Sequence, residues 1–283
     1  MKLLVSGASG YVGAGILRRA PKDWNVAATS LAHPIEQPGV AAFRVDVRDA
    51  DAVNHLFAEF RPDVVIHTAA RMTGDEMMAI NAEGSLNIAR AATQGHARLI
   101  HLSSDVIFDG EHAPYDESAL PAPITPYARS KARAEQLVRA ESPGALIVRT
   151  SLVYGFDPID PRTRQTLNGE FPHLFTDEYR CPIFVDDLAD ALIEIAAQSC
   201  DVSKTAQVFV LNIAGPQRLS RYEFDIKFAQ AYRVLPRFEP AVSTFFPAPR
   251  PRDCALDIAL ARKILQTRLR SVDQVLSFMA RWT

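Results

Sequence analysis

Short, almost continuously hydrophobic runs alternate with amphipathic stretches along the first half of the chain. Six of these runs are predicted strands: residues 2–6, 24–30, 40–45, 62–70, 97–104 and 144–155. Helical spacing predicts helices between them: a stretch ending near residue 20, then residues 49–60, residues 77–93 and a stretch starting at residue 126. Because such strands are buried on both faces, the order predicts an α/β fold, a Rossmann-type doubly wound parallel sheet.

After residue 155 the pattern changes. Residues 155–175 are rich in Pro, Gly and Arg and are predicted to form a long loop. The other predicted elements are a helix at 185–198, a strand at 206–214, a helix at 219–232, a proline-laden connector at 236–253 and two short C-terminal helices. Ser220 and Glu223 stand at capping-box spacing at the start of the second helix.

These patterns predict two parts of unequal size. We expect residues 1–155 to form a dinucleotide-binding Rossmann core. Residues 156–283 are expected to form mainly a smaller substrate-binding lobe, with about 185–214 returning to the core.

Composition narrows the class of protein. The 283 residues are 48% hydrophobic and 23% charged, with a net charge of −2, so we expect no nucleic-acid or membrane partner. Cys181, Cys200 and Cys254 stand far apart without a CxxC pair, and we expect neither a disulfide framework nor a metal site. The start "MKLLVSG" is too short for a signal-peptide core, so the expected location is the cytoplasm.

A glycine-rich loop lies between the first strand and the first helix. "GASGYVG" places Gly7, Gly10 and Gly13 where the pyrophosphate of a dinucleotide would meet a helix N-terminus. The alternative is a tight turn with close packing, but the position of the loop favours cofactor binding. We expect three further residues of this loop to contact the cofactor: Ser9, Tyr11 and Val12.

The end of the second strand bears on the choice between NAD and NADP. NAD-binding sites usually place a carboxylate there, but this strand ends at Ser30 without one, and no arginine stands at that position. NADP is therefore favoured over NAD. Asp46, after the third strand, is the expected partner of the adenine amino group, with Val47 beside it; the alternative is that Asp46 caps the helix starting near residue 49.

"TPYARSK" carries the candidate chemistry. Thr125 suits an N-cap and Pro126 the first helical position, so Tyr127 and Lys131 lie one turn apart on the same face. An isolated pair of this kind is usually a surface pair. Here the preceding strand also brings serines to the carboxyl edge of the sheet, where ligands bind. A lysine ammonium and an oxidised nicotinamide would lower the pKa of a phenol, which predicts hydride transfer to or from a carbonyl.

Together, several segments resemble an extended short-chain dehydrogenase/reductase, and more narrowly the dTDP-4-dehydrorhamnose reductase group. The segments are "GASGYVG", "HTAA", "INAEGSLNIA", "HLSSDVIFDG", "PYDESALPAPITPYARSK" and "RTSLVYG". The resemblance implies that Ser104 is the catalytic Ser/Thr, Tyr127 the general acid and Lys131 the residue that lowers the pKa of Tyr127 and holds the nicotinamide ribose. It implies that Ala69 and Ala70 line the cofactor and that Asn81 supports the active site. We also expect Ser30, Ser103 and Tyr127 to contact the cofactor.

The resemblance also bears on the substrate, a 4-keto-6-deoxy nucleotide sugar. Asp105 matches the group, but Val106 replaces its tyrosine, and the glutamate of the related dehydratases is missing, which disfavours dehydration. Leu152 stands where the group has a tryptophan facing the sugar. Arg180 and Arg252 are the expected partners of the substrate diphosphate.

Two alternatives to an NAD(P)H-dependent reductase stay open at this point. One is a nucleotide-sugar epimerase that uses the same three residues. The other is a binding protein similar to the regulatory subunit of methionine adenosyltransferase. The resemblance also implies a homodimer. His67 and His101 lie in predicted strands, where hydrogen-bonded core histidines are more usual than ligands.

Overall fold

The structure is a computed structural model that describes residues 1–198, 209–245 and 247–279. It divides the chain into two compact units. Unit 1 comprises Met1–Ser104, Pro126–Arg149 and Ala189–Leu211, whereas unit 2 comprises Asp105–Thr125, Thr150–Leu188 and Asn212–Thr283.

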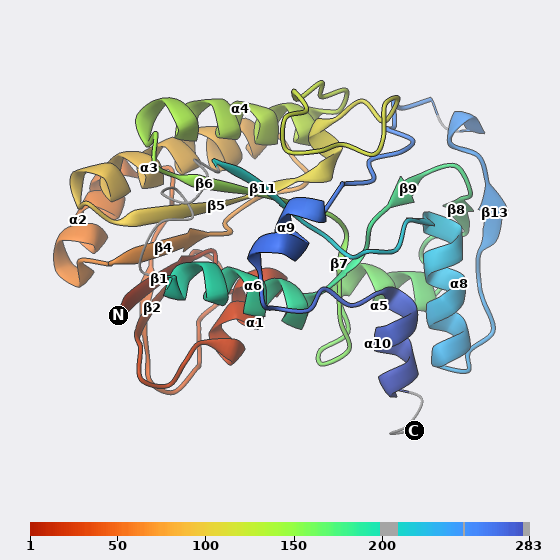
Figure 1. Cartoon of the computed structure of the whole chain (residues 1–283), viewed down its shortest axis with the longest axis horizontal. Helices are drawn as coiled ribbons and strands as arrows, with labels where there is room; N and C mark the ends of the chain where they lie inside the picture. Colours follow the sequence, from red (N-terminus) through yellow and green to blue (C-terminus); the bar gives the residue numbers. More distant parts are fainter. Residues whose placement is uncertain (199–208, 246, 280–283) are drawn as a thin grey trace. The chain divides into compact units, whose positions relative to one another are not determined.

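A seven-stranded parallel sheet forms the centre of the fold, which confirms the predicted class. Its strands are β1 (Lys2–Ser6), β2 (Asn25–Ser30), β3 (Val40–Arg44), β4 (Val64–His67), β5 (Arg98–Ser104), β6 (Leu146–Thr150) and β11 (Val210–Ile213). Their order is β11-β6-β5-β4-β1-β2-β3, so the direction of winding reverses between β1 and β4 (Figure 1). In doubly wound folds, ligands bind at the carboxyl ends of the strands at such a point.

Helices cover both faces of this sheet, as the amphipathic stretches predict. They are α1 (Tyr11–Arg19), α2 (Ala50–Phe60), α3 (Gly84–Gln94), α4 (Pro126–Glu141) and α6 (Val185–Ala197). Figure 1 shows α2, α3 and α4 along one face, with α1 and α6 along the other. An exposed ion pair of 2.5 Å between Arg19 and Asp190 joins α1 to α6.

Three predicted elements differ in the structure. The sixth strand is interrupted, so that β7 (Val153–Tyr154) pairs with β10 (Ile183–Phe184) outside the main sheet. The helix expected at 77–93 begins with a π-helical turn, Ala79–Glu83. The strand expected at 206–214 is seen only as β11, because residues 206–208 lie outside the described part of the chain.

The prediction of a loop at 155–175 was wrong. This segment contains a helix, α5 (Pro161–Leu167), and a strand, β8 (His173–Phe175). Asp160 caps α5 by accepting a hydrogen bond from the Thr163 amide, and Pro161 takes the first helical position. The buried side of α5 carries Thr163 and Thr166. Hydrophobic periodicity cannot reveal a helix whose buried side is formed by hydroxyl-bearing residues.

Unit 2 is built from short strand pairs and helices around an aromatic core. Its other elements are β9 (Tyr179–Arg180), β12 (Leu219–Ser220), α8 (Arg221–Ala231), β13 (Glu239–Ala241), a 3₁₀ turn (Ser243–Phe245), α9 (Ala259–Ile264) and α10 (Val272–Met279). The segment predicted as a connector, residues 236–253, contains β13, and this strand pairs with β8. Tyr154, Phe224 and Phe228 form the centre of the core, and the predicted capping box of α8 is confirmed.

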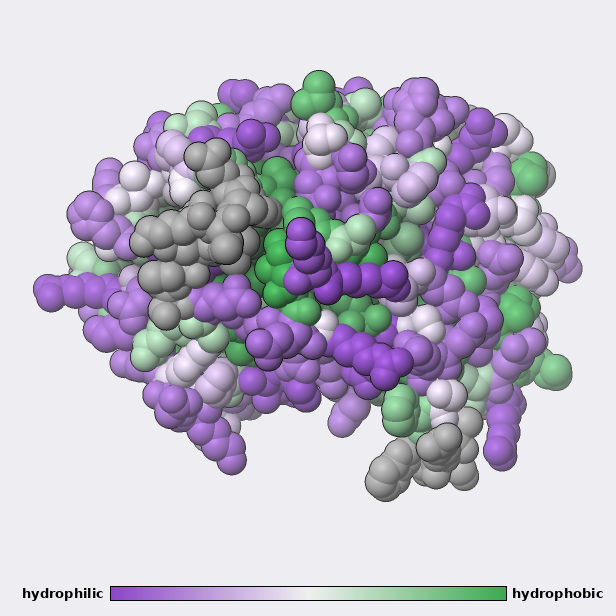
Figure 2. All heavy atoms as spheres, viewed as in Figure 1, coloured by the Kyte–Doolittle hydropathy of each residue, from purple (hydrophilic) through white to green (hydrophobic). Residues whose placement is uncertain are grey.

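No described helix is both long and apolar enough to cross a membrane. Figure 2 shows hydrophilic residues over most of the visible face.

A row of buried polar residues crosses the sheet of unit 1. The strand register places Ser6 beside His67 and His67 beside His101. The ring of His67 makes hydrogen bonds to the hydroxyls of Ser6 at 3.1 Å and of Ser85 at 2.9 Å, as expected for a core histidine. By contrast, both ring nitrogens of His101 lack a hydrogen-bond partner among the described residues, so His101 does not match that expectation.

This difference predicts different effects of two matched substitutions on the free energy of unfolding. Burial lowers the pKa of His67 to about 3 and lowers that of His101 well below its usual range, so both rings are neutral. His67→Leu leaves two buried hydroxyls without that partner and should lower the free energy of unfolding by about 2 kcal/mol or more. His101→Leu removes two unpaired nitrogens and should leave it unchanged or raise it.

Urea unfolding of both variants at neutral pH tests this prediction. Equal destabilisation by the two substitutions would contradict it, because the bulk of the ring would then matter more than its hydrogen bonds.

Candidate active site

The glycine loop packs closely against the chain that follows β4. Gly7 has a positive φ of 79°, and a Cβ on it would lie 2.5 Å from the backbone of Ala69. A Cβ on Gly13 would lie 2.6 Å from Ala8 and from the Gly7 carbonyl. A side chain at Gly7 would therefore overlap the chain after β4, and one at Gly13 would overlap the glycine loop itself.

The start of α1 suits an anionic ligand. Gly10 is its N-cap, provides no side-chain hydrogen bond, and is followed by no acidic residue in the first turn. The first amides of such a helix have no intrahelical partner and favour negative charge. Ser9 is exposed and Tyr11 and Val12 are half-buried along this turn. These residues fit the pyrophosphate of a dinucleotide.

The strand ends on either side of the loop complete this region. The Ala8 amide donates to the Thr29 carbonyl at 2.8 Å, so the loop is joined to the end of β2, just before Ser30. Ala69 is half-buried and Ala70 is exposed beyond the end of β4. These positions bring the predicted cofactor residues of β1, β2 and β4 to one edge of the sheet.

Asp46 is held by a neighbouring arginine. Its carboxylate forms a 2.6 Å ion pair with Arg48, which lowers its pKa. The alternative in which Asp46 caps α2 is wrong, because Asp49 is the N-cap and accepts from the Ala52 amide. Val47 is buried against Gly84. The adenine contact of Asp46 and Val47 stays a prediction.

Tyr127 and Lys131 lie on α4, which begins at Pro126 as predicted. Tyr127 is half-buried, while Lys131 is 3% exposed and its Nζ donates to the Leu102 carbonyl of β5 at 2.7 Å. Burial lowers the pKa of Lys131 to about 8, against the opposing effect of the Glu135 carboxylate. Lys131 is therefore mainly an ammonium at pH 7, with its charge near the carboxyl end of β5.

The two serines of β5 end the strand next to that ammonium. Ser103 is buried, and its hydroxyl has no hydrogen-bond partner among the described residues. Ser104 is half-buried on the other side of the strand, because successive side chains alternate between the faces of a sheet. Unit 1 therefore contains the serines, Tyr127, Lys131 and the glycine loop.

Asn81 fastens the start of α4. Its amide group exchanges hydrogen bonds with the backbone of Arg71, at 2.7 and 2.8 Å, and donates to the Ser130 hydroxyl at 2.8 Å. Ser130 in turn donates to the Tyr127 carbonyl at 2.7 Å. Asn81 lies in the π-helical turn, a distortion that is frequent at functional sites.

A buried ion pair holds the middle of the same helix. Glu135 and Arg149 are 3% and 2% exposed and lie 2.9 Å apart, joining α4 to β6. Breaking one side of such a pair leaves an uncompensated buried charge, so the pair specifies how α4 lies on the sheet. Sequence reasoning missed it, because nothing in the chain shows that positions 135 and 149 meet.

Two of the predicted substrate residues of unit 2, Asp105 and Arg180, belong to a second polar cluster. The buried Asp105 carboxylate accepts from the Ser151 hydroxyl at 2.6 Å and lies 3.9 Å from the Arg180 guanidinium. Ser151 also accepts from the Cys181 amide at 3.1 Å, and sequence reasoning missed this serine. The guanidinium of Arg180 also donates to the carbonyls of Tyr179, Pro251 and Arg252. A diphosphate contact by Arg180 stays a prediction.

The other two predicted substrate residues have different surroundings within unit 2. Leu152 is half-buried and packs against the aromatic core. Arg252 is exposed and lies 3.5 Å from Glu111. Their contacts with a sugar and a diphosphate also stay predictions.

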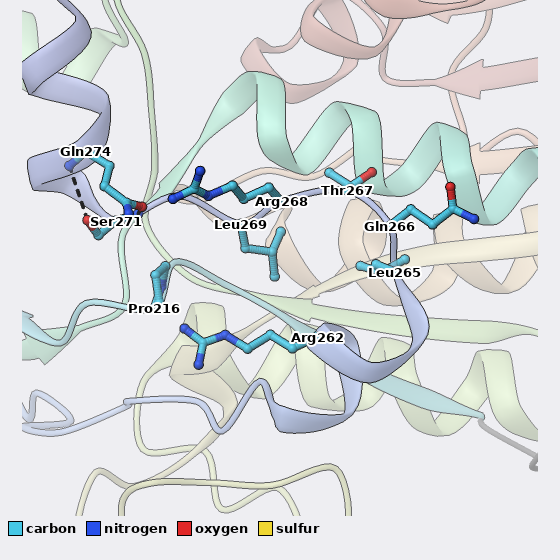
Figure 3. Close-up of a pocket in the computed structure, with 9 residues that line it drawn as sticks. All are labelled: Pro216, Arg262, Leu265, Gln266, Thr267, Arg268, Leu269, Ser271 and Gln274. Carbon is cyan, nitrogen blue, oxygen red and sulfur yellow. Dashed lines mark hydrogen bonds between the residues drawn. The ribbon is translucent and has the colours of Figure 1, made fainter.

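Unit 2 also has a pocket of about 460 Å³ beside α9 and the start of α10 (Figure 3). Arg262 and Arg268 are the charged residues of its lining, and Figure 3 draws both as sticks. No predicted site residue lines this pocket. Across the described ranges, no group of three His, Cys, Asp or Glu side chains could hold a metal ion.

Comparison with known proteins gives the family. A model described as the RmlD substrate binding domain matches residues 1–281. The dTDP-4-dehydrorhamnose reductase of Mycobacterium tuberculosis is 32% identical over 263 residues, covering 89% of this chain and 82% of that protein. Methionine adenosyltransferase 2 subunit beta of Pongo abelii is 27% identical over 283 residues, covering 90% of this chain and 80% of that protein.

Solved structures show the same fold. The dTDP-4-dehydrorhamnose reductase of Bacillus anthracis, determined in complex with NADP, has a TM-score of 0.82 at 22% identity, covering 100% of this chain and 99% of that one. The family match, the sheet order and the glycine loop between β1 and α1 agree with one another. The chain therefore belongs to the RmlD substrate binding domain family.

Proposed function

We propose that this protein reduces the keto group of a 4-keto-6-deoxy nucleotide sugar, with NADPH or NADH as the reductant. The observation that carries the proposal is the buried ammonium of Lys131 one turn from Tyr127, near the serines that end β5. The similarity to dTDP-4-dehydrorhamnose reductases supports the class of substrate.

Each residue has a separate role in this reaction. The reduced nicotinamide, when bound, supplies the hydride. The Tyr127 hydroxyl donates a proton to the carbonyl oxygen as negative charge develops there. The Lys131 ammonium stabilises the resulting phenolate, and the Ser104 hydroxyl donates a hydrogen bond that holds the carbonyl toward Tyr127.

Asn81 and the Glu135–Arg149 pair act on these groups only through α4. Asn81 holds the first turn through Ser130, and the ion pair holds the helix one turn beyond Lys131. Because a small displacement of a reacting group can lower a rate greatly, these contacts bear on turnover without touching the substrate.

Tyr127→Phe tests the general acid. Because Phe lacks the proton donor, kcat should fall by about 10²-fold or more. The affinity for the reduced nicotinamide cofactor, measured by fluorescence titration, should stay within about twofold because the ring is kept.

Unchanged turnover in Tyr127→Phe would exclude Tyr127 as the acid. Thr125→Ser, on the chain just before α4, is a matched control in which both measurements should stay near those of the unmodified protein.

The depressed pKa of Lys131 predicts a pH dependence. An ammonium with a pKa of about 8 is charged below that pH and loses its proton above it. The value of kcat/KM for the free enzyme should therefore fall as pH rises through about 8. In Lys131→Arg the side chain stays charged to about pH 12, so any residual activity should not fall near the same pH.

A pH–rate profile of both proteins makes the comparison. The assignment would be wrong if kcat/KM of the unmodified protein stayed flat from about pH 7 to about pH 9.5, because Lys131 would then not titrate in the free enzyme.

The similarity to methionine adenosyltransferase 2 subunit beta supports a second candidate, a regulatory subunit. That function predicts a stoichiometric complex with a methionine adenosyltransferase and no turnover of keto sugars. An epimerase would instead act on nucleotide sugars with no net consumption of reduced nicotinamide. Gel filtration with the candidate partner and absorbance at the reduced-nicotinamide band separate the three functions.

A further inference from the structure

The end of β2 has a neighbour that the linear sequence does not show. In the parallel pairing of β2 and β3, Ser30 is the register partner of Arg44. Register partners on adjacent strands lie about 5 Å apart, and their side chains point to the same face of the sheet. Arg44 therefore stands beside Ser30 at the carboxyl edge, although 14 positions separate them in the chain.

The Arg44 guanidinium is held at this edge with unused hydrogen-bond donors. Its Nε donates to the Leu31 carbonyl at 3.2 Å, directly after β2. Within residues 1–198, 209–245 and 247–279, neither of its terminal nitrogens has an ion-pair partner, and the side chain is exposed. By contrast, Arg48 nearby is paired with both Asp46 and Glu76.

The surroundings of Arg44 favour a doubly charged anion over a neutral hydroxyl. Ser30 ends β2 where a carboxylate would otherwise accept from ribose hydroxyls, and no acidic residue follows it before Glu36. The Gly7 amide donates to the Thr29 hydroxyl at 3.3 Å, so this edge continues directly from the glycine loop. The adenosine ribose of a dinucleotide seated on that loop lies toward the end of the second strand.

We propose that Arg44, together with Ser30, forms the binding site for the 2′-phosphate of NADP and makes the protein prefer NADP to NAD. The proposal rests on the proposed function only in that a nicotinamide dinucleotide binds at the glycine loop. The planar guanidinium donates to two phosphate oxygens, and the Ser30 hydroxyl donates to a third. Arg44 acts on cofactor choice and takes no part in the chemical step.

Binding measurements on the full chain test the proposal without any substrate. Titrations of NADPH and NADH should show tighter binding of NADPH. Arg44→Ala should weaken the binding of NADPH by about 10- to 100-fold, the range expected for hydrogen bonds to a charged group. The affinity for NADH should stay within about twofold of that of the unmodified protein. The fragment 2′,5′-ADP should lose affinity in the same variant, whereas 5′-AMP should not.

Two further variants sharpen the comparison. Arg48→Ala removes the neighbouring paired arginine, so the ratio of NADPH to NADH affinity should stay unchanged even if both weaken. Ser30→Asp introduces a carboxylate that repels the 2′-phosphate and accepts from ribose hydroxyls, so it should shift the preference toward NADH. The melting temperature of each free variant shows whether the exposed substitutions leave the fold intact.

The possible failures are distinguishable. If Arg44→Ala weakens the binding of NADPH and NADH equally, or changes neither affinity, the proposal for Arg44 is wrong but dinucleotide binding is not contradicted. If neither dinucleotide binds the unmodified protein, the proposed function itself is wrong. An NADPH advantage that stays constant as salt is raised would also contradict a contact between exposed charges.

Discussion

The buried ammonium of Lys131 is the constraint on which the arrangement of the candidate site depends. An ammonium removed from water is costly unless hydrogen bonds and nearby opposite charge compensate it. Here the Leu102 carbonyl accepts from Nζ at 2.7 Å, and Glu135 lies one turn further along α4. The buried position of Lys131 lowers its pKa and places its ammonium beside the end of β5.

Such a group requires that α4 lie on the sheet in one position. Two polar contacts specify that position: the Glu135–Arg149 ion pair to β6 and the hydrogen bonds of Asn81 and Ser130 at the first turn. Buried polar contacts are directional, unlike hydrophobic packing, so they restrict the rotation and translation of a helix. These interior polar contacts hold the helix that carries Tyr127 and Lys131.

The glycine loop of unit 1, the predicted phosphate-binding site, depends on a different kind of contact. Gly7 and Gly13 allow backbone segments to approach within distances that a Cβ would prevent. The loop is then joined to β2 through Thr29, and the register of β2 with β3 adds Arg44 to the same edge. Close backbone packing sets the shape of the glycine loop, and the pairing of β2 with β3 sets which side chains lie beside it.

How far the sequence could predict these features depends on the distance over which each one acts. The parallel sheet, the helix beginning at Pro126 and the capping box at Ser220 arise from local patterns, and the structure agrees with them. The helix α5 was missed because its buried side is polar, and Ser151 because its partner, Asp105, lies far away in the chain. Along the chain no arginine lies next to Ser30, but the pairing of β2 with β3 places Arg44 beside it.

The sequence by itself determined the fold class and the residue types available for chemistry. Hydrophobic periodicity, glycine placement and helix-start signals are local and can be interpreted along one strand or turn. The tertiary structure decided which residues meet: Lys131 with Leu102, Glu135 with Arg149 and Ser30 with Arg44. Those pairings depend on register and helix packing, which arise only when segments distant in the chain are brought side by side.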